Sequence, residues 1–470
     1  MNRLYFLLLT ISSISLNGQN FEMAANPNDE DTYLYELGQS FIECLNGPSQ
    51  SEADALMKTL YIPSASEGLA AQLRKEYGTL EKASIRIMPD RMSIHVVGWL
   101  PKMKAWRNFQ IGFTDEAPKK GRRLAIVLAA PPNTIAEGKI EDQAILNEVN
   151  AYVDQLIEEH GLSGSLMIAN DDKVLIRRTY GIADKDIGRK ITPETALNLA
   201  STGKLFTTVS ILRLIESGKL ALEDKLIQFI PDYQNKTVAE KVTVGMLLSH
   251  QSGIGDFWDS AYEKDWDNIR GHSDYLPHIV RQPKAFEPGA RASYSNSNFI
   301  LLGLIIEKVT GQDYYSHIKS TILEPLGMSN SGFFTKAEKD RVALGYLDLG
   351  DDMIRTRGGW VGSAAGGSFS TANDLMKFRN ALLNYELVGK EILDLATSEQ
   401  SLMDGYAPYG YGFSLNGNFK TAFGHGGLGP GAGVAFDIDK ASGLTFILLS
   451  NKVNGAYSEL LFTLRELLSR

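Results

Sequence analysis

The spacing of apolar and polar residues predicts two structurally different parts in this chain. In the first part, helical spacing over residues 32–46 and 53–60 precedes strand-like runs that are separated by turns containing proline or charged residues. These runs cover residues 84–88, 92–100, 106–113 and 124–129. Helices followed by an antiparallel meander predict a small α+β domain over residues 30–132.

A second domain is expected after Pro131 and Pro132. Two successive prolines cannot continue a helix or a central strand, so we expect a linker over residues 133–139. Residues 140–470 begin with a helix and a hairpin, continue through a long helix-rich middle, and return to a hairpin and a final helix at 456–468. This order predicts an α/β sandwich, in which an antiparallel sheet is flanked by helices.

The chain begins with a short apolar segment. Arg3 precedes the apolar stretch 4–16, which is too short to cross a membrane comfortably, and a polar, acidic stretch follows at 26–31. We therefore expect residues 1–19 to be a signal peptide and the protein to be exported to the periplasm or the extracellular space. No stable membrane span would remain after processing. A buried N-terminal strand or helix is the alternative interpretation.

The amino-acid composition argues against several classes of ligand. The chain has 47 Lys and Arg against 56 Asp and Glu, a formal charge of −9, and no basic cluster offsets it, which argues against nucleic acid. The single cysteine, Cys44, excludes an internal disulfide and a cysteine-rich metal site. The histidines show no metal-ligand spacing. We therefore expect neither a metal nor a cofactor, and a small molecule or short peptide as the substrate.

Ser201 and Lys204 are the first residues that suggest a reaction. They stand at the start of a helix predicted to run to about residue 217, and their spacing of three places both on one face. A serine hydroxyl becomes a good nucleophile when a base removes its proton, and a lysine with a neutral amine can be that base. An N-cap serine beside a solvated lysine is the alternative, since so short a pattern also arises by chance.

Two further segments carry polar residues in unusual settings. Tyr294 and Asn296 lie in a polar turn before a helix, 298–309, that is apolar nearly all round and therefore buried. His425 lies in the glycine-rich stretch 424–431 at the entrance to a strand, where backbone can lie open to a ligand. Because its neighbours are glycines, we expect the imidazole of His425 to be accessible and to change charge near neutral pH.

Taken together, these three motifs resemble a family signature. Ser-x-x-Lys at 201–204, Tyr-x-Asn at 294–296 and His-x-Gly at 425–427 are similar in order and spacing to those of the penicillin-recognising, β-lactamase-like serine hydrolases. That family includes class C β-lactamases, D-alanyl-D-alanine carboxypeptidases, D-aminopeptidases and β-lactamase-like esterases. The resemblance covers residues 140–470. Residues 30–132 resemble, more weakly, the cone-like domain of nuclear transport factor two, where a homodimer contact would form.

The resemblance implies a fold and a set of roles. The fold would be a β-lactamase-like α/β sandwich with an all-helical region, preceded by the small α+β cone-like domain. Ser201 would be the acylated nucleophile, and Lys204 and Tyr294 would share the proton transfers. The remaining residues would bind substrate: Asn296 would contact the lysine and the substrate, His425 would face a substrate carboxylate, and the N–H of Leu428, just past Gly427, would join that of Ser201 in an oxyanion hole.

One departure from the family pattern bears on the substrate. His-Gly-Gly stands where many relatives have Lys-Thr-Gly or Lys-Ser-Gly, so both a permanent cation and a hydroxyl are missing. We therefore expect an exported serine hydrolase that forms an acyl-enzyme on esters or on D-amino-acid-type amides and peptides, with weak activity on β-lactams. The alternative is a non-catalytic sensor that binds cell-wall peptides or β-lactams on the same scaffold. The intact motifs favour the enzyme.

Overall fold

The computed structural model describes two compact units. The described residues are 30–47, 69–87, 93–113, 121–130, 135, 139–334, 341–348, 353–355, 362–404, 407–415 and 422–468. One unit contains the chain up to Ile135 together with Asn454–Ser469, and the other contains Ala136–Val453. The expected signal peptide at 1–19, the helix at 53–60 and most of the linker at 133–139 lie outside the described residues.

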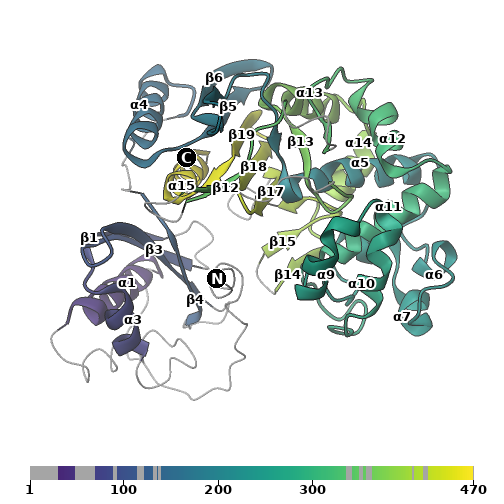
Figure 1. The fold of residues 1–470 in the computed structure, drawn as a ribbon, viewed down its shortest axis with the longest axis horizontal. Coiled ribbons are helices and arrows are strands. Elements are labelled where there is room, and N and C mark those ends of the chain that lie inside the picture. The colour runs from purple at the N-terminus through teal and green to yellow at the C-terminus, as the bar shows by residue number, and fades with distance from the viewer. Residues whose placement is uncertain are drawn as a thin grey trace. The chain divides into compact units, whose positions relative to one another are not determined.

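The first unit is an antiparallel sheet with helices (Figure 1). The strands pair in chain order, and the apolar face of the sheet packs against the helix at the N-terminal end of the unit, with Leu34 and Phe41 buried against Phe109 and Ile111. Its elements are α1 (Glu30–Asn46), α3 (Leu69–Tyr77), β1 (Glu81–Ile87), β2 (Ser93–Leu100), β3 (Ala105–Phe113), β4 (Gly121–Leu128) and α15 (Gly455–Leu468). The predicted helix-then-meander order is thus present.

The C-terminal helix α15 belongs to this first unit. Its Glu459 lies 3.4 Å from Arg86 of β1, and the ring of Phe462 packs edge-on against His95 of β2. Burial lowers the pKa of His95 to about 3, so this imidazole is neutral. An amphipathic pattern predicts a helix but does not say which of two apolar surfaces it will cover.

The second unit is built around an eight-stranded antiparallel sheet in the order β14-β15-β16-β17-β18-β19-β5-β6. The early hairpin joins the late one through β5 and β19, where Gly164 pairs with Ser450 and Asn170 with Leu444. Every residue of β19 is buried, as expected for a central strand covered on both faces. The strands are β5 (Gly164–Asn170), β6 (Lys173–Tyr180), β14 (Ser401–Met403), β15 (Ala407–Tyr409), β16 (Ser414–Leu415), β17 (Ala422–Gly429), β18 (Ala432–Asp439) and β19 (Leu444–Ser450).

Helices and shorter strands complete this unit (Figure 1). The helices are α4 (Gln143–His160), α5 (Lys204–Glu216), α6 (Leu226–Phe229), α7 (Lys236–Lys241), α8 (Val244–Leu248), α9 (Ser260–Asp265), α10 (Leu276–Val280), α11 (Asn296–Thr310), α12 (Tyr314–Ile318), α13 (Ala372–Leu383) and α14 (Lys390–Ala396). The short strands are β7 (Ile182–Asp184), β8 (Arg189–Lys190), β9 (Leu197–Asn198), β10 (Gly332–Phe333), β11 (Tyr346–Asp348), β12 (Met353–Arg355), β13 (Ser368–Ser370) and β20 (Lys452–Val453). The predicted α/β fold is confirmed.

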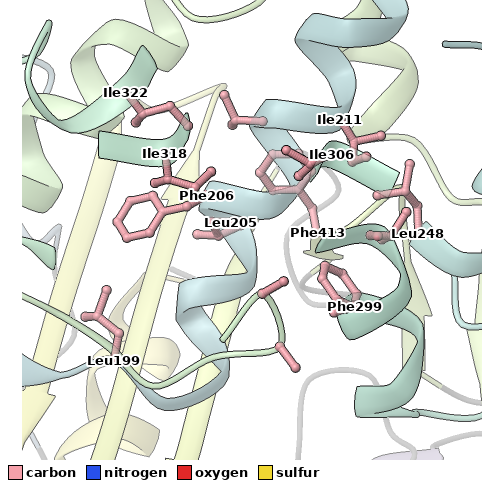
Figure 2. Packing of buried hydrophobic residues seen from close by; sticks show 14 of the residues in the cluster. Leu199, Leu205, Phe206, Ile211, Leu248, Phe299, Ile306, Ile318, Ile322 and Phe413 are labelled. Carbon is pink, nitrogen blue, oxygen red and sulfur yellow. The ribbon is translucent and has the colours of Figure 1, made fainter. Parts of the chain in front are cut away.

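The helical region packs around α5 and α11 (Figure 2). Phe206 and Ile211 of α5 are buried in the same cluster as Phe299 and Ile306 of α11. Each such side chain contributes about 1.5–3 kcal/mol by leaving water, so the two helices are held firmly together. This packing matters for function because α5 begins at Lys204 and α11 begins at Asn296. None of the helices in the described part of the chain has the length and hydropathy that a membrane crossing requires.

Candidate active site

Ser201 lies in a strained turn directly before α5. A short 3₁₀ turn, Ala200–Gly203, leads into the helix, and Ala200 has a φ of +44°, a conformation that costs a non-glycine residue roughly 1–3 kcal/mol. Hydrogen bonds hold it there: the Ala200 N–H donates to Asn198 Oδ1 at 2.8 Å, and its carbonyl accepts from the Gly367 N–H at 3.0 Å. The strain is therefore fixed by neighbouring segments at the residue before the expected nucleophile.

Lys204, the first residue of α5, has a fully buried side chain that ends beside Ser201. Its Nζ lies 3.3 Å from Ser201 Oγ and 2.8 Å from Asn296 Oδ1, and it also bonds the carbonyl oxygen of Ala365. Burial lowers the pKa of Lys204 to about 7, although nearby Asp256 acts in the opposite direction. A large share of this amine is therefore neutral near pH 7.

The three hydrogen-bonding partners of Lys204 differ in whether they can donate a hydrogen. The oxygens of Asn296 and Ala365 can only accept hydrogen bonds, whereas the hydroxyl of Ser201 can also donate. A neutral amine has two N–H groups and one lone pair. When the two N–H groups go to the fixed acceptors, the lone pair points at Ser201, which is the arrangement a general base requires.

Asp256 orients the amide of Asn296, and sequence reasoning missed it. Its Oδ2 accepts from both the backbone N–H and the side-chain Nδ2 of Asn296, each at 2.9 Å, and its Oδ1 accepts from the Trp258 N–H at 3.0 Å. Because Nδ2 faces the carboxylate, Oδ1 of Asn296 must face Lys204. Asp256 lies outside the three motifs of the sequence analysis, and no spacing in the sequence links it to Asn296.

The phenol of Tyr294 is buried beside the same amine. Lys204 Nζ lies 4.9 Å from the centre of its ring. Among the described residues its hydroxyl meets no partner at hydrogen-bond geometry, although Ser201 is near enough to favour the ionised form. Burial outweighs that effect and raises the pKa of Tyr294 well above its usual range. The phenol therefore keeps its proton at neutral pH and can donate it.

The imidazole of His250 packs against the ring of Tyr294. The two rings stack with centres 4.5 Å apart. His250 Nδ1 accepts from the backbone N–H of Ser295 at 3.2 Å and from the Asn298 side-chain amide at 3.2 Å, so the proton of its neutral ring is on Nε2. Burial, with a contribution from Lys204, lowers the pKa of His250 well below its ordinary value. His250 thus positions the Tyr294 loop without carrying charge.

His425 differs from the sequence-based expectation. Its side chain is 3% exposed, and burial lowers its pKa to about 3, so the expected accessible imidazole that titrates near neutral pH is wrong. Nε2 accepts from the hydroxyl of Tyr409 at 3.0 Å, and the Nδ1 hydrogen donates to the carbonyl oxygen of Gly426. Tyr409, on β15, which is separated from β17 by β16 in the sheet, packs edge-on against the imidazole with ring centres 6.0 Å apart. Neither ring nitrogen is left for a substrate carboxylate.

Gly427 and Leu428 lie in β17 rather than in a loop before it. A Cβ atom on Gly427 would stand 3.1 Å from the backbone nitrogen of Ser201 and 2.5 Å from the carbonyl oxygen of Leu199, so only glycine fits here. The hydroxyl of Thr202 donates to the His425 carbonyl oxygen at 3.1 Å and ties the Ser201 turn to this strand. The 427–428 backbone therefore passes close to the Ser201 N–H, as an oxyanion hole requires, while the Leu428 side chain is 68% exposed.

The structure thus brings four of the seven expected residues into direct contact around one amine and places a strand beside them. Ser201, Lys204, Tyr294 and Asn296 form the cluster, and Gly427 lies against the Ser201 turn. In the described part of the chain, no group of three or more His, Cys, Asp or Glu side chains is placed to hold a metal ion. The chemistry that this cluster can perform is proton transfer and nucleophilic attack.

Comparisons with known proteins agree with this geometry. The family model described as "Beta-lactamase" matches residues 149–468. Esterase EstB of Burkholderia gladioli is 29% identical over 235 residues, which cover 47% of this chain and 59% of the esterase. The crystal structure of a penicillin binding protein from Bacillus halodurans superposes with a TM-score of 0.59 at 27% identity, over 67% of this chain and 98% of that one. D-amino acid amidase from Ochrobactrum anthropi shares the fold, with a TM-score of 0.58 at 24% identity over 68% of this chain and 99% of the amidase.

Proposed function

Because the chain belongs to the beta-lactamase family, whose model covers residues 149–468, we propose that it is an exported serine hydrolase that forms an acyl-enzyme at Ser201. Its relatives in that family include an esterase, and a D-amino acid amidase shares its fold. The observation that carries the proposal is the set of three contacts at Lys204, which leave the lone pair of a neutral amine facing the Ser201 hydroxyl.

Acylation begins at Ser201. Neutral Lys204 takes the hydroxyl proton, and Oγ bonds to the carbonyl carbon of an ester or amide. The negative oxygen of the tetrahedral intermediate accepts from the backbone N–H groups of Ser201 and Leu428, each donor lowering the barrier by about 3 kcal/mol. Tyr294, whose raised pKa keeps it protonated, donates to the leaving group and is reprotonated by the Lys204 ammonium.

Deacylation uses the same groups in the opposite direction. Water attacks the acyl carbon as Lys204, neutral again, accepts its proton, and Ser201 Oγ leaves with a proton returned by the ammonium. Asn296 holds the amine in place through both steps because Asp256 fixes its amide. The proton returns to where it started, so each turnover consumes only substrate and water.

The substrate class follows from the charges around the nucleophile. His425 is buried and neutral with both nitrogens occupied, so it offers a substrate carboxylate no counter-charge. Leu428 presents an exposed apolar side chain beside the proposed oxyanion hole. Neutral esters and D-amino-acid-type amides or short peptides are therefore preferred to β-lactams, whose recognition would require a cation at this place.

A substrate panel tests the proposal. We expect turnover of p-nitrophenyl esters or D-amino-acid p-nitroanilides, slow hydrolysis of nitrocefin, and the loss of many orders of magnitude of activity in Ser201→Ala. Activity of the variant within about tenfold of the wild type would exclude Ser201 as the nucleophile. Tight binding of D-peptides or penicillin without turnover, by a folded protein, would favour the non-catalytic sensor instead. Mass analysis of the exported protein's N-terminus tests cleavage after residues 1–19.

A further inference from the structure

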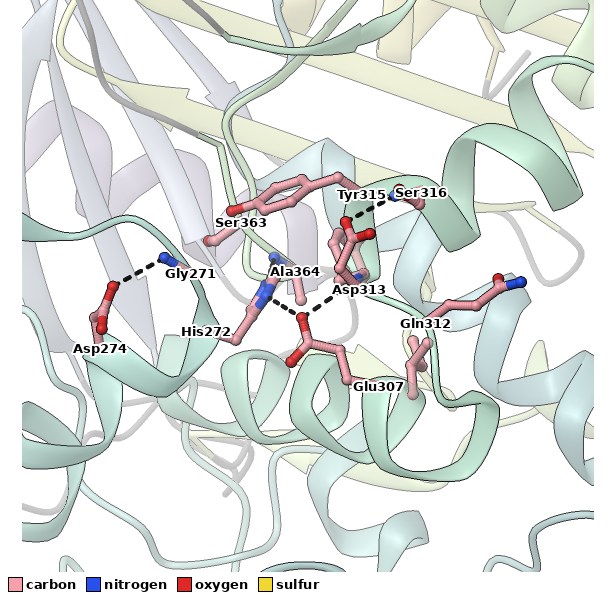
Figure 3. A network of polar contacts seen from close by, with 12 residues as sticks. Gly271, His272, Asp274, Glu307, Gln312, Asp313, Tyr315, Ser316, Ser363 and Ala364 are labelled. Atoms are coloured by element: carbon pink, nitrogen blue, oxygen red, sulfur yellow. Dashed lines mark hydrogen bonds and ion pairs between the residues drawn. The ribbon is translucent and has the colours of Figure 1, made fainter.

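The carbonyl oxygen that Lys204 bonds, that of Ala365, belongs to a tight turn beside the active site. Figure 3 shows Ala364 of this turn next to His272. Ser363 and Gly366 close this turn with two backbone hydrogen bonds, of 2.7 and 3.0 Å. Directly after it, the Gly367 N–H donates to the carbonyl of Ala200 at 3.0 Å. One segment, 363–367, therefore contacts both the base and the residue before the nucleophile.

Two side chains hold this segment in place by hydrogen bonds to the backbone of Ala364. Its N–H donates to Nε2 of His272 at 2.9 Å, and its carbonyl accepts from the hydroxyl of Thr207 at 2.8 Å. A backbone N–H can only donate, so Nε2 of His272 carries no hydrogen, and the ring hydrogen must be on Nδ1. Nδ1 lies 3.2 Å from Oε1 of Glu307 and donates to it. The carboxylate thereby sets the tautomer that the turn requires.

The imidazole of His272 has no room to move. Its side chain is fully buried, and the ring of Tyr314 packs edge-on against it with centres 4.7 Å apart. A side chain at Gly303 of α11 would stand 2.8 Å from His272 Cδ2 and 2.7 Å from the Cβ of Ala364, so the helix, the imidazole and the turn are in close contact. Figure 3 shows Glu307, His272 and Ala364 following one another in a row.

We propose that His272 is a positioning residue for the reaction at Ser201. By accepting from the Ala364 N–H, it keeps the next carbonyl, that of Ala365, where Lys204 can donate to it. That contact occupies one N–H of the amine and leaves the lone pair directed at Ser201. The inference rests on the proposed function, since it concerns the base of that reaction.

Removing the His272 acceptor should change both the pKa and the orientation of the Lys204 amine. If the turn relaxes, the ammonium loses one of its carbonyl partners, so its pKa falls further and the lone pair is no longer aimed at Ser201. Asp256, Tyr294, His250 and His425 also lie close enough to influence this amine. Among the described residues, the hydrogen-bond and ring partners of His272 are others, namely Ala364, Glu307, Tyr275, Tyr314 and Tyr315. The acid limb of the kcat/KM profile should move to lower pH while kcat falls.

Three variants separate positioning from a general effect on the fold. His272→Leu removes the acceptor, and we expect kcat on a neutral ester to fall roughly tenfold to a hundredfold with little change in KM, and the acid limb to move down by about half a pH unit. His272→Gln can accept from Ala364 and donate to Glu307, so its kcat and the pH of its acid limb should both lie close to those of the wild type. His278→Leu is the matched control, because His278 is also buried and pairs with a carboxylate, that of Asp265 at 2.9 Å. Its acid limb should stay at the wild-type pH.

A measurement without substrate makes the outcome independent of turnover. The ¹³Cε resonance of Lys204, assigned by comparison with Lys204→Arg, reports the titration of the amine in the full-length protein. We expect its midpoint to fall in His272→Leu and to stay unchanged in His278→Leu. If the wild type neither turns over esters nor is labelled at Ser201, the proposed function fails while this titration still decides the role of His272.

An unchanged midpoint in a folded His272→Leu, or an equal shift in His278→Leu, overturns the proposal. Should His272→Leu not fold, Thr207→Val replaces it, because it removes the other hydrogen bond to Ala364 and conserves side-chain shape. An unmoved Lys204 titration in Thr207→Val would then contradict the positioning role.

Discussion

Lys204 Nζ lies 3.3 Å from Ser201 Oγ, with its other two hydrogen-bonding neighbours being oxygens that can only accept. The relationship joins the first turn of α5 to two distant segments, Asn296 at the start of α11 and Ala365 in a tight turn. A buried amine with these partners has a pKa of about 7 and is still held in one orientation. The reaction proposed for this protein depends on that combination.

Lys204→Ala and Lys204→Arg should both lose most of the activity. Alanine removes the base, and a guanidinium is effectively never deprotonated, so arginine keeps the charge but cannot accept the Ser201 proton. We expect kcat to fall by about a hundredfold or more in each. Steady-state kinetics on a neutral ester checks this, with circular dichroism as the control for folding. An active Lys204→Arg would mean that the lysine acts only as a charge.

The buried amine should also affect the pH dependence of stability. The pKa of Lys204 is about 7 in the folded protein and is that of an ordinary lysine, near 10.5, in the unfolded chain. Between these values the unfolded state binds more protons, so the wild type gains stability as pH rises from 7 towards 10.5. Lys204→Met lacks this contribution. Between urea unfolding at pH 7 and at pH 9.5, the free energy of unfolding of the wild type should increase relative to that of Lys204→Met. A difference between the two proteins that stays constant with pH would contradict the lowered pKa.

Asp256 and Asn296 should behave as one unit. Asp256→Ala leaves the Asn296 amide free to turn, so it removes the same contact to Lys204 that Asn296→Ala removes. We expect each single variant to lower kcat/KM about tenfold or more and the double variant to be little worse than either, a coupling of about 1–2 kcal/mol. Additive losses in the double-mutant cycle would show that the carboxylate acts separately from the amide.

The buried position of His425 predicts that this residue does not select substrates by charge. Because both imidazole nitrogens are used within the protein, His425→Leu should leave the ratio of kcat/KM for a carboxylate-bearing ester and its methyl-ester counterpart within about twofold of wild type. It should also lower the free energy of unfolding by about 1–3 kcal/mol, since the buried hydroxyl of Tyr409 loses its acceptor. A large change in the substrate ratio would show that His425 faces the substrate after all.

The parts of the site that could be predicted from sequence are those set by local geometry. Ser201 and Lys204 are one helical turn apart, and Tyr294 and Asn296 share one turn before a buried helix, so a short pattern is enough to pair them. Ala365 contacts the same amine directly, whereas Asp256 acts on it through Asn296 and His272 through Ala364. All three lie at least fifty residues from Ser201, where no period or spacing marks them. Their roles depend on tertiary contacts alone.

The error at His425 comes from a contact with a distant strand. The glycines around His425 predict open backbone, but they say nothing of Tyr409, sixteen residues earlier on another strand, whose ring packs edge-on against the imidazole. A periodic pattern predicts an element more securely than it predicts the surface against which that element packs.

The most direct test of the account is the pH dependence of covalent labelling at Ser201. A fluorophosphonate added to the full-length protein should raise its mass by one adduct, located on Ser201 by peptide mapping and absent in Ser201→Ala. The labelling rate should rise with pH through a midpoint near 7, where Lys204 loses its proton, and this rise should disappear in Lys204→Arg. No adduct on a folded protein, an adduct elsewhere, or a rate that does not change between pH 5 and 9 would contradict the claim that neutral Lys204 activates Ser201.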